Sequence, residues 1–226
     1  MTTVELSNEF DILYNNISSN QAPGLDEYEK SVFLTKAQEA VVTSLYNSFE
    51  KTEADRELLA TLVVHKILTP ITNNSYITTV NNLKKDPSLI FELDNELMFI
   101  VGEELIVNTD CGEKRVSVKP VLTDELPKII KNPFNGVTDR QALRANLSLG
   151  VDKQFVELFT KEKAFDYLMS YIKRPEPIML YTTSDFASLT INEVSPLATP
   201  RECKLNPMLH RTILETAVAD AIARYK

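Results

Sequence analysis

The sequence predicts an α+β protein with an N-terminal helical bundle, a central antiparallel β region and a C-terminal helix. Three observations predict this class. Apolar residues recur at every third or fourth position through residues 1–68, which is the period of an amphipathic helix. From about Leu89 the period shortens towards two and β-branched residues become frequent, as they do in strands. Asn206 and Pro207 then form a helix start ahead of a last apolar stripe.

We expect three parts within one structural unit. These are a helical part over residues 1–70, a mainly antiparallel β part with long loops over 71–205, and a terminal helix over 206–226. A chain of 226 residues has room for one large core or for a domain with an extension.

Three helices are expected before the first strand. Ser7 is a candidate N-cap of the first helix. Asp26 and Glu29 have the spacing of a capping box and open the second. The third begins at Thr52, runs towards Ile67 and is stopped by Pro70.

Short apolar runs separated by turn residues predict the strands. They cover residues 90–93, 97–101, 105–108, 114–121, 141–149, 154–159 and 177–181. Residues 164–172 carry both a helical stripe and a two-residue alternation, and we favour a strand. Asp110-Cys111-Gly112 is a plausible hairpin turn. Residues 123–140 are polar and interrupted by proline, which predicts a long excursion of the kind that often touches a partner.

Composition excludes several classes of function. With 24 Lys and Arg against 32 Asp and Glu, the net charge of -8 disfavours tight wrapping of nucleic acid. The five glycines lie ten or more positions apart, so dinucleotide-binding loops, phosphate-binding loops and nucleophile elbows are excluded. The longest apolar run, 97–101, is too short for a membrane span, and the first ten residues lack the basic region of a signal peptide.

The residues that most often carry catalysis or bind metals are sparse. Cys203 and His210 lie seven positions apart, but no third orienting group accompanies them. His65, on the apolar flank of the third expected helix, is interpreted as a hydrogen-bonded structural histidine. A zinc site would need all of Cys111, Cys203, His65 and His210 as ligands. None of them has the close sequence spacing that is typical of zinc ligands.

Adjacent charged residues are interpreted as surface. The carboxylate pairs at 26–27, 103–104 and 124–125 could in principle hold magnesium. Neighbouring residues of a strand point to opposite faces, however, so Glu103 and Glu104 cannot share one ion. Lys173 and Arg174 are flanked by acids and predict a surface turn. We therefore expect no catalytic site, no cofactor site and no metal site.

Apolar stripes near the two chain ends are the remaining candidates for function. The first helix is too short to be stable alone and needs a surface to dock on. In the last helix, alanines four positions apart allow close approach of another helix. Both stripes can form core within the chain or insert between subunits. The candidate interface residues are Phe10, Leu13, Tyr14, Leu25, Ile213, Ala217, Ala221, Ile222 and Tyr225.

Several segments resemble virion structural proteins of tailed bacteriophages, notably the crAss-like phages of Bacteroidetes hosts. They are SNEFDILYNNI at residues 7–17, APGLDEYEKSVFLTKAQE at 22–39, YIKRPEPI at 171–178, ECKLN at 202–206 and LHRTI at 209–213. The match brackets most of the chain, and its middle is less distinctive.

The resemblance implies a head-to-tail connector, a portal adaptor ring protein assembled in the host cytoplasm and carried in the virion. Its implied partners are further copies of itself in a closed ring, twelve-fold like the portal, together with the portal protein and neighbouring tail or ring proteins. Genome DNA would pass through the channel without sequence-specific binding, and no membrane is involved. The family pattern carries no catalytic residues and no cofactors.

Three alternatives stay open at this point. The chain could be another virion component, in the tail or associated with the capsid. It could be a metal-dependent phage nuclease that uses Asp110, Glu113 and Lys114, although a hairpin turn explains those residues equally well. It could also be an adaptor that binds a host protein outside the virion.

Overall fold

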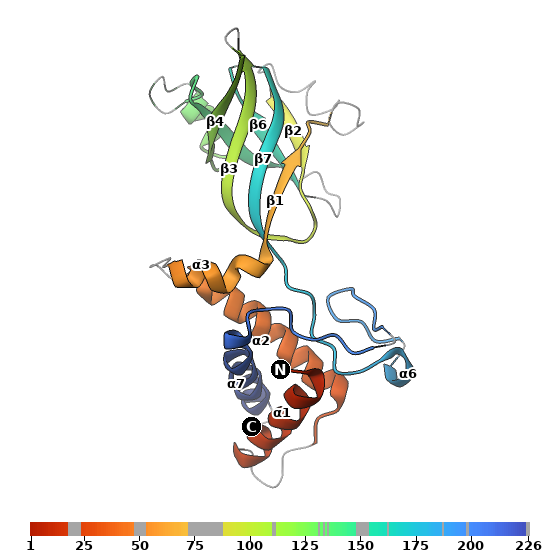
Figure 1. Ribbon diagram of the computed structural model, residues 1–226. Coiled ribbons are helices and arrows are strands. Elements are labelled where there is room, and N and C mark those ends of the chain that lie inside the picture. Colours follow the sequence, from red (N-terminus) through yellow and green to blue (C-terminus); the bar gives the residue numbers. More distant parts are fainter. Residues whose placement is uncertain are drawn as a thin grey trace. The chain divides into compact units, whose positions relative to one another are not determined.

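The protein has a mixed α+β fold, shown as a computed structural model in Figure 1. Helices form at both ends of the sequence, and the strands of a curled sheet lie in its middle part. The structure describes residues 1–17, 24–47, 53–71, 88–109, 112–130, 132, 134, 136–147, 154–161, 163–186, 188–197 and 199–224. It has two compact units. The helical unit comprises Met1–Leu62 and Arg174–Lys226, and the sheet unit comprises Val63–Lys173.

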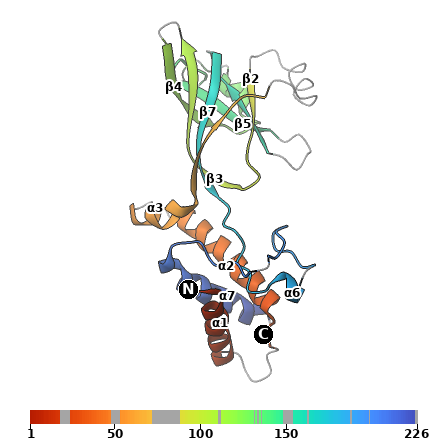
Figure 2. The same cartoon turned by 45° about the vertical axis from the view of Figure 1, so that its right-hand side comes forward.

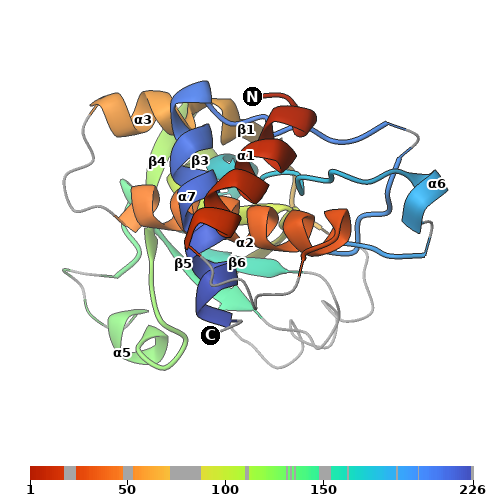
Figure 3. The same cartoon turned by 90° about the horizontal axis from the view of Figure 1, so that it is seen from below.

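Four helices of seven or more residues and one four-residue helix build the described part of the helical unit. They are α1 (Thr3–Ile17), α2 (Glu27–Asn47), α3 (Glu53–Leu59) with a 3₁₀ turn at Ala60–Leu62, the short α6 (Thr183–Phe186) and α7 (Pro207–Arg224). α7 packs against both α1 and α2, and Figure 3 shows it crossing α2 with α1 beside it. The two ends of the chain therefore share one core.

Side-chain caps explain where these helices begin. Glu29 N donates to Asp26 Oδ1 at 2.7 Å and Asp26 N donates to Glu29 Oε2 at 3.2 Å, which confirms the expected capping box. Met208 N donates to Asn206 Oδ1 at 3.1 Å, so Asn206 caps α7 as expected.

The prediction that Ser7 caps the first helix was wrong. α1 begins at Thr3, and Thr2 and Glu5 exchange the reciprocal bonds of a capping box there, Thr2 N to Glu5 Oε2 at 2.9 Å and Glu5 N to Thr2 Oγ1 at 3.3 Å. Ser7 lies inside the helix and its hydroxyl donates to Glu27 Oε1 of α2 at 2.9 Å. The expected cap of the third helix, Thr52, lies outside the described residues.

Buried polar side chains of α2 hold an extended segment of the chain. Ile178 N donates to Thr35 Oγ1 at 3.1 Å and Leu180 N donates to Ser31 Oγ at 2.9 Å. Gln38 Nε2 donates to the Glu176 carbonyl at 3.2 Å. These positions recur on one face of the helix, so they satisfy backbone groups that would otherwise be buried without partners. Residues 177–181 therefore pack on a helix and join no sheet, contrary to the strand expected there.

Seven strands form the sheet unit in the order β1-β7-β3-β4-β5-β6-β2. Their bounds are β1 (Val63–Leu68), β2 (Ser88–Glu92), β3 (Leu97–Thr109), β4 (Gly112–Pro120), β5 (Gln141–Leu147), β6 (Phe155–Phe159) and β7 (Lys163–Lys173). Of the neighbouring pairs, β4 and β5 are parallel and the others are antiparallel. The sheet is thus mainly antiparallel, as expected. β4 and β5 are parallel because the excursion with α5 (Leu126–Ile130) brings the chain back beside Ser117, from where β5 runs in the same direction as β4.

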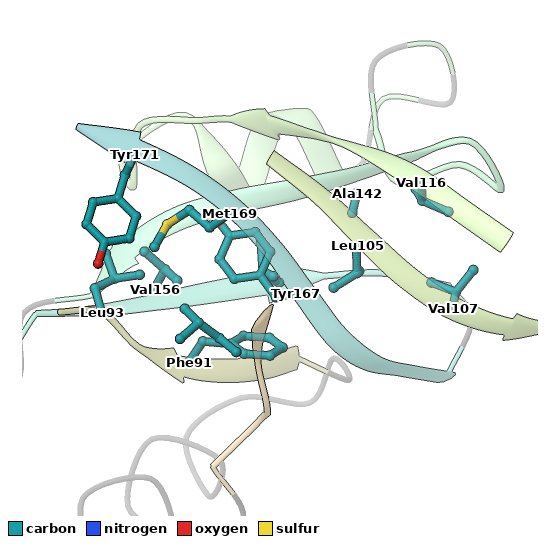
Figure 4. Close-up of a cluster of buried hydrophobic side chains, with 12 residues drawn as sticks. Phe91, Leu93, Leu105, Val107, Val116, Ala142, Val156, Tyr167, Met169 and Tyr171 are labelled. Carbon is teal, nitrogen blue, oxygen red and sulfur yellow. The ribbon is translucent and has the colours of Figure 1, made fainter. Parts of the chain in front are cut away.

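The inner face of the curled sheet encloses the largest apolar cluster. It takes side chains from all seven strands: Leu68, Phe91, Leu93, Leu105, Val107, Val116, Ala142, Val156, Leu158, Tyr167, Met169 and Tyr171. Figure 4 shows this cluster, with all of these residues except Leu68 and Leu158 labelled. One face of a flat sheet could not bring strands from opposite edges together, so the strands bend around the cluster, as Figures 1 and 2 show. A smaller cluster lies between α5 and the outer side of β5.

The third helix is shorter than expected. α3 ends at Leu59, and the segment predicted to continue to Ile67 is β1, paired with β7 from Val63↔Ile172 to Leu68↔Tyr167. Its β-branched residues fit an extended, half-covered position better than a helix. His65 therefore lies exposed on a strand, with Nδ1 2.7 Å from Ser170 Oγ.

Two expected strands are one in the structure. The segments at 97–101 and 105–108 both belong to β3, whose pairing with β7 shifts register at three places. Such bulges let a long strand bend. The strand favoured at 164–172 is confirmed as β7, and the strands begin at Val63 and end at Lys173, earlier at both ends than the predicted β part.

Candidate interface residues

Five of the nine candidate interface residues lie in the core of the helical unit. Phe10 and Tyr14 on α1 are buried with their rings stacked at a centroid distance of 6.2 Å. Ile213, Ala217 and Ala221 on α7 are also buried. The stripes at the two chain ends thus pack within the unit, and the small alanine side chains allow α7 to lie close to its neighbours.

The other four candidates are placed differently. Leu13, Leu25 and Ile222 are half-buried, and Tyr225 lies outside the described residues. A role of any of the nine in contacts between subunits stays a prediction.

Sequence reasoning missed the apolar side chains that the structure leaves most exposed. On α1, Val4 and Ile12 are 68% and 59% exposed, on the opposite side of the helix from buried Leu6 and Phe10. Met208 in the first turn of α7 and Leu122 after β4 are likewise exposed. The available signal was that Val4 and Ile12 are apolar residues outside the predicted stripe of α1.

Phe134 is the most exposed of these residues, at 90%. Phe134 N donates to Asn132 Oδ1 at 2.9 Å, Asn132 N donates to the Ile129 carbonyl at 3.0 Å, and Gly136 N donates to the Asn132 carbonyl at 2.8 Å. A Cβ on Gly136 would lie 2.6 Å from the Asn132 carbonyl oxygen. The backbone can pass so close only because residue 136 is glycine.

Charge is distributed unequally between the two units. The helical unit contains 17 Asp and Glu against 10 Lys and Arg, a net charge of -7. The sheet unit contains 15 against 14, a net charge of -1. Nearly all of the chain's excess negative charge therefore lies in the helical unit.

The cysteine and histidine near the last helix do not form a nucleophile and its base. His210 is buried; its Nε2 lies 3.0 Å from the Leu205 carbonyl oxygen, and its Nδ1 lies 2.9 Å from the Met1 amino group. Both ring nitrogens are thus engaged by other groups. Burial raises the pKa of the Cys203 thiol, which disfavours the reactive thiolate.

The structure describes two of the three residues of the nuclease alternative. Lys114 Nζ donates to the Asp139 carbonyl at 2.8 Å and Glu113 is exposed on β4, whereas Asp110 lies outside the described residues. Within the described ranges, no group of three or more His, Cys, Asp or Glu residues is placed to hold a metal ion. No described helix is long and apolar enough to span a membrane.

Comparison with known proteins places the chain in a family. A family model described as phage tail ring protein 3/4 matches residues 1–226. The chain is 34% identical over 235 residues to ring protein 4/5 of Bacteroides phage crAss001, which covers 100% of this chain and 94% of that protein. It is 37% identical over 235 residues to ring protein 3 of the same phage, covering 98% and 95%. The chain therefore belongs to the phage tail ring protein 3/4 family of crAss-like phages.

Proposed function

We propose that the protein is a virion subunit that forms a closed ring in the head-to-tail connector, beneath the portal, through which the genome passes. The ring would contain twelve copies, to match the portal. Its work is mechanical: it joins neighbouring virion proteins and keeps a channel open, and it turns over no substrate.

The observation that carries this proposal is the match of the whole chain to the ring family, from residue 1 to residue 226. Both compact units are part of that match. The similarity to two different ring proteins of one phage supports a fold used for ring subunits rather than for one position in the virion.

The charge of the chain is compatible with a DNA channel. A surface of net negative charge repels the phosphate backbone, so DNA slides past it instead of binding. We propose that part of the helical unit, with its net charge of -7, faces the channel.

The position of the ring has a second candidate. The family description names the tail, so the ring can also lie further from the portal, among other tail rings. The two positions have the same subunit contacts around the ring and differ in the proteins above and below it.

Cryo-electron microscopy of the virion tests both parts of the proposal. The expected result is a ring of density that fits both compact units, in contact with the portal and at equal copy number by quantitative mass spectrometry. A ring without portal contact would support the second position. Absence of the chain from purified virions would contradict the proposed function.

A further inference from the structure

We infer that an exposed turn and Arg174 compete for one carboxylate of α2, so that together they form a conformational switch within the helical unit. The turn is the connection at Asn192 and Glu193, and the carboxylate belongs to Glu39. Arg174 is the residue at which the chain enters the helical unit from the sheet unit. We call this arrangement the carboxylate switch, and it does not depend on the proposed ring function.

The turn is closed by hydrogen bonds but carries backbone strain. Ile191 N donates to the Val194 carbonyl at 3.1 Å, and Val194 N donates to the Ile191 carbonyl at 2.9 Å. Asn192 and Glu193 have φ angles of 50° and 65°, as a type I′ turn requires of its two central residues. Asparagine adopts this left-handed backbone readily, whereas glutamate adopts it only at a cost in free energy. The closed turn therefore depends on a contact outside itself.

Glu39 supplies that contact and is also the nearest carboxylate to a cation. Asn192 Nδ2 donates to Glu39 Oε1 at 2.9 Å. Arg174 Nε lies 3.8 Å from the same oxygen, which is beyond hydrogen-bond distance. A guanidinium is a stronger donor to a carboxylate than a neutral amide is. The longer distance to the stronger donor indicates that the closed turn holds the carboxylate away from Arg174.

The carboxylate switch therefore has two arrangements. With the turn closed, Glu39 binds Asn192 and is only loosely paired with Arg174. When the turn opens, its strain is relieved and the carboxylate is free to form a charge-assisted bond with Arg174. The side chains of Glu39 and Arg174 are 31% and 54% exposed, so solvent weakens their attraction. The free-energy difference between the two arrangements is correspondingly small.

The two ends of the carboxylate switch lie far apart in the sequence. Asn192 and Glu193 are exposed, so other molecules can reach the turn. Arg174 follows Lys173, whose Nζ lies 2.7 Å from Glu96 Oε2 in the sheet unit. These two adjacent basic residues thus pair with carboxylates of different units. A contact that keeps the turn closed leaves Arg174 loosely paired, and one that opens the turn strengthens its pair.

Amide hydrogen exchange of the full chain, followed by NMR, tests the competition. The Val194 amide reports on the turn, because its hydrogen bond breaks when the turn opens. Arg174→Gln removes the competing cation and is expected to slow exchange of this amide by about twofold to fivefold. Removal of an arginine that only supported the local fold would leave the exchange unchanged or make it faster. Either of those results would overturn the inference.

Two further variants control this measurement. Lys204→Gln removes one positive charge from the same unit, at a residue that pairs with Glu176 at 2.8 Å, and should leave exchange of the Val194 amide unchanged. Equal slowing in Lys204→Gln and Arg174→Gln would assign the effect to net charge and overturn the inference. Glu193→Gly relieves the left-handed strain and should slow the exchange, because the amide then reads a more stable turn.

The coupling must also act in the opposite direction, because linkage between two sites is reciprocal. Asn192→Ala removes the donor of the turn, so Glu39 pairs with Arg174 and the Arg174 Nε proton should exchange more slowly with solvent. The Nε proton of Arg211, which pairs with Glu215 at 3.0 Å within α7, is the control in the same spectra and should not change. Unaltered exchange at Arg174 in Asn192→Ala would overturn the inference.

Discussion

Arg144 and Glu103 form an ion pair inside the curled sheet, with 2.9 Å between Arg144 Nε and Glu103 Oε1. The two side chains are only 11% and 7% exposed. Glu103 is on β3 and Arg144 is on β5, so the pair spans the intervening β4. Burial raises the pKa of the Glu103 carboxyl, and the charge of Arg144 opposes that rise. The pair therefore joins strands that share no hydrogen bonds.

Removing one partner of this pair should destabilise the sheet unit strongly. Arg144→Ala leaves the Glu103 carboxylate buried without its counter-charge, which costs about 3–5 kcal/mol at neutral pH. A buried carboxyl whose folded pKa lies above its unfolded value loses stability as the pH rises. The loss should therefore shrink as the pH falls through the raised folded pKa and be smallest below the unfolded pKa of about 4.3, where the carboxyl is protonated in both states. Urea unfolding followed by tyrosine fluorescence measures it, since the chain has no tryptophan.

The exposed pair of Arg115 and Glu104 is the matched control. Its side chains are 69% and 49% exposed at an N–O distance of 3.0 Å, so Arg115→Ala should cost no more than about 1 kcal/mol. Equal losses for the two arginine variants would contradict the role given to the buried pair.

Asp94 should make the stability of the sheet unit depend on acid pH. Lys66 Nζ donates to its two oxygens at 2.6 and 2.8 Å, and Tyr171 Oη donates at 2.5 Å. These bonds, chiefly that from Lys66, hold the pKa of Asp94 below its ordinary value. The stabilisation is therefore complete above the unfolded pKa of about 4 and is lost as the pH falls through the lower folded pKa.

Asp94→Asn should lower the free energy of unfolding by about 1–2 kcal/mol at pH 7. The difference from wild type should close towards pH 2. Asp139→Asn, at an exposed carboxylate 3.5 Å from Lys161 Nζ, should change little at either pH. A deficit in Asp94→Asn that persists unchanged at pH 2 would show that the charge is not its cause.

Ala221→Arg should unfold or loosen the helical unit. Ala221 is fully buried on α7, so a larger charged side chain both overpacks the core and desolvates its charge, at a cost of about 3 kcal/mol or more. Circular dichroism on heating measures the loss of helix, and incorporation into virions should fall with it. Ala219→Arg, two positions away on the exposed side, should retain the wild-type melting temperature. Normal folding of Ala221→Arg with failed incorporation would instead support burial of this residue between subunits.

Gly136→Ala should destabilise the turn that carries Phe134. The added Cβ would lie 2.6 Å from the Asn132 carbonyl oxygen, and relieving this contact costs about 1–3 kcal/mol. Gly102→Ala is the control within the same unit, because its Cβ would meet only Ser170 Cβ at 3.9 Å. Alanine is the better strand residue by roughly 0.5–1 kcal/mol, so the control should be neutral or more stable. Chemical denaturation compares the two, and an unaffected Gly136→Ala would show that the turn can relax.

Structural features that depend on a few neighbouring residues were predicted well. The capping box of Asp26 and Glu29 and the cap at Asn206 depend only on short side chains reaching the nearest free amides. Such signals mislead where a distant strand competes. Residues 63–68 have an apolar pattern that suits a helix, but pairing with β7 makes them a strand.

The candidate interface was predicted from apolar stripes, which identify a buried face without naming what buries it. Phe10 and Ala221 were chosen for that pattern, and α1 and α7 bury them within the helical unit. Val4 and Ile12 lie outside the predicted stripe, but only the fold shows that they and Phe134 are exposed.

By itself the sequence determined the α+β class, most strand positions, two helix starts and the ring family, because these depend on local period, on short-range capping and on runs of residues. Only the tertiary structure decided that β4 and β5 are parallel, that two hydroxyls and one side-chain amide of α2 hold the segment at 176–180, and that Glu103 meets Arg144. Those contacts join residues far apart in the chain. Their free energy depends on which buried polar group meets which partner, a choice made only when the chain closes around its core.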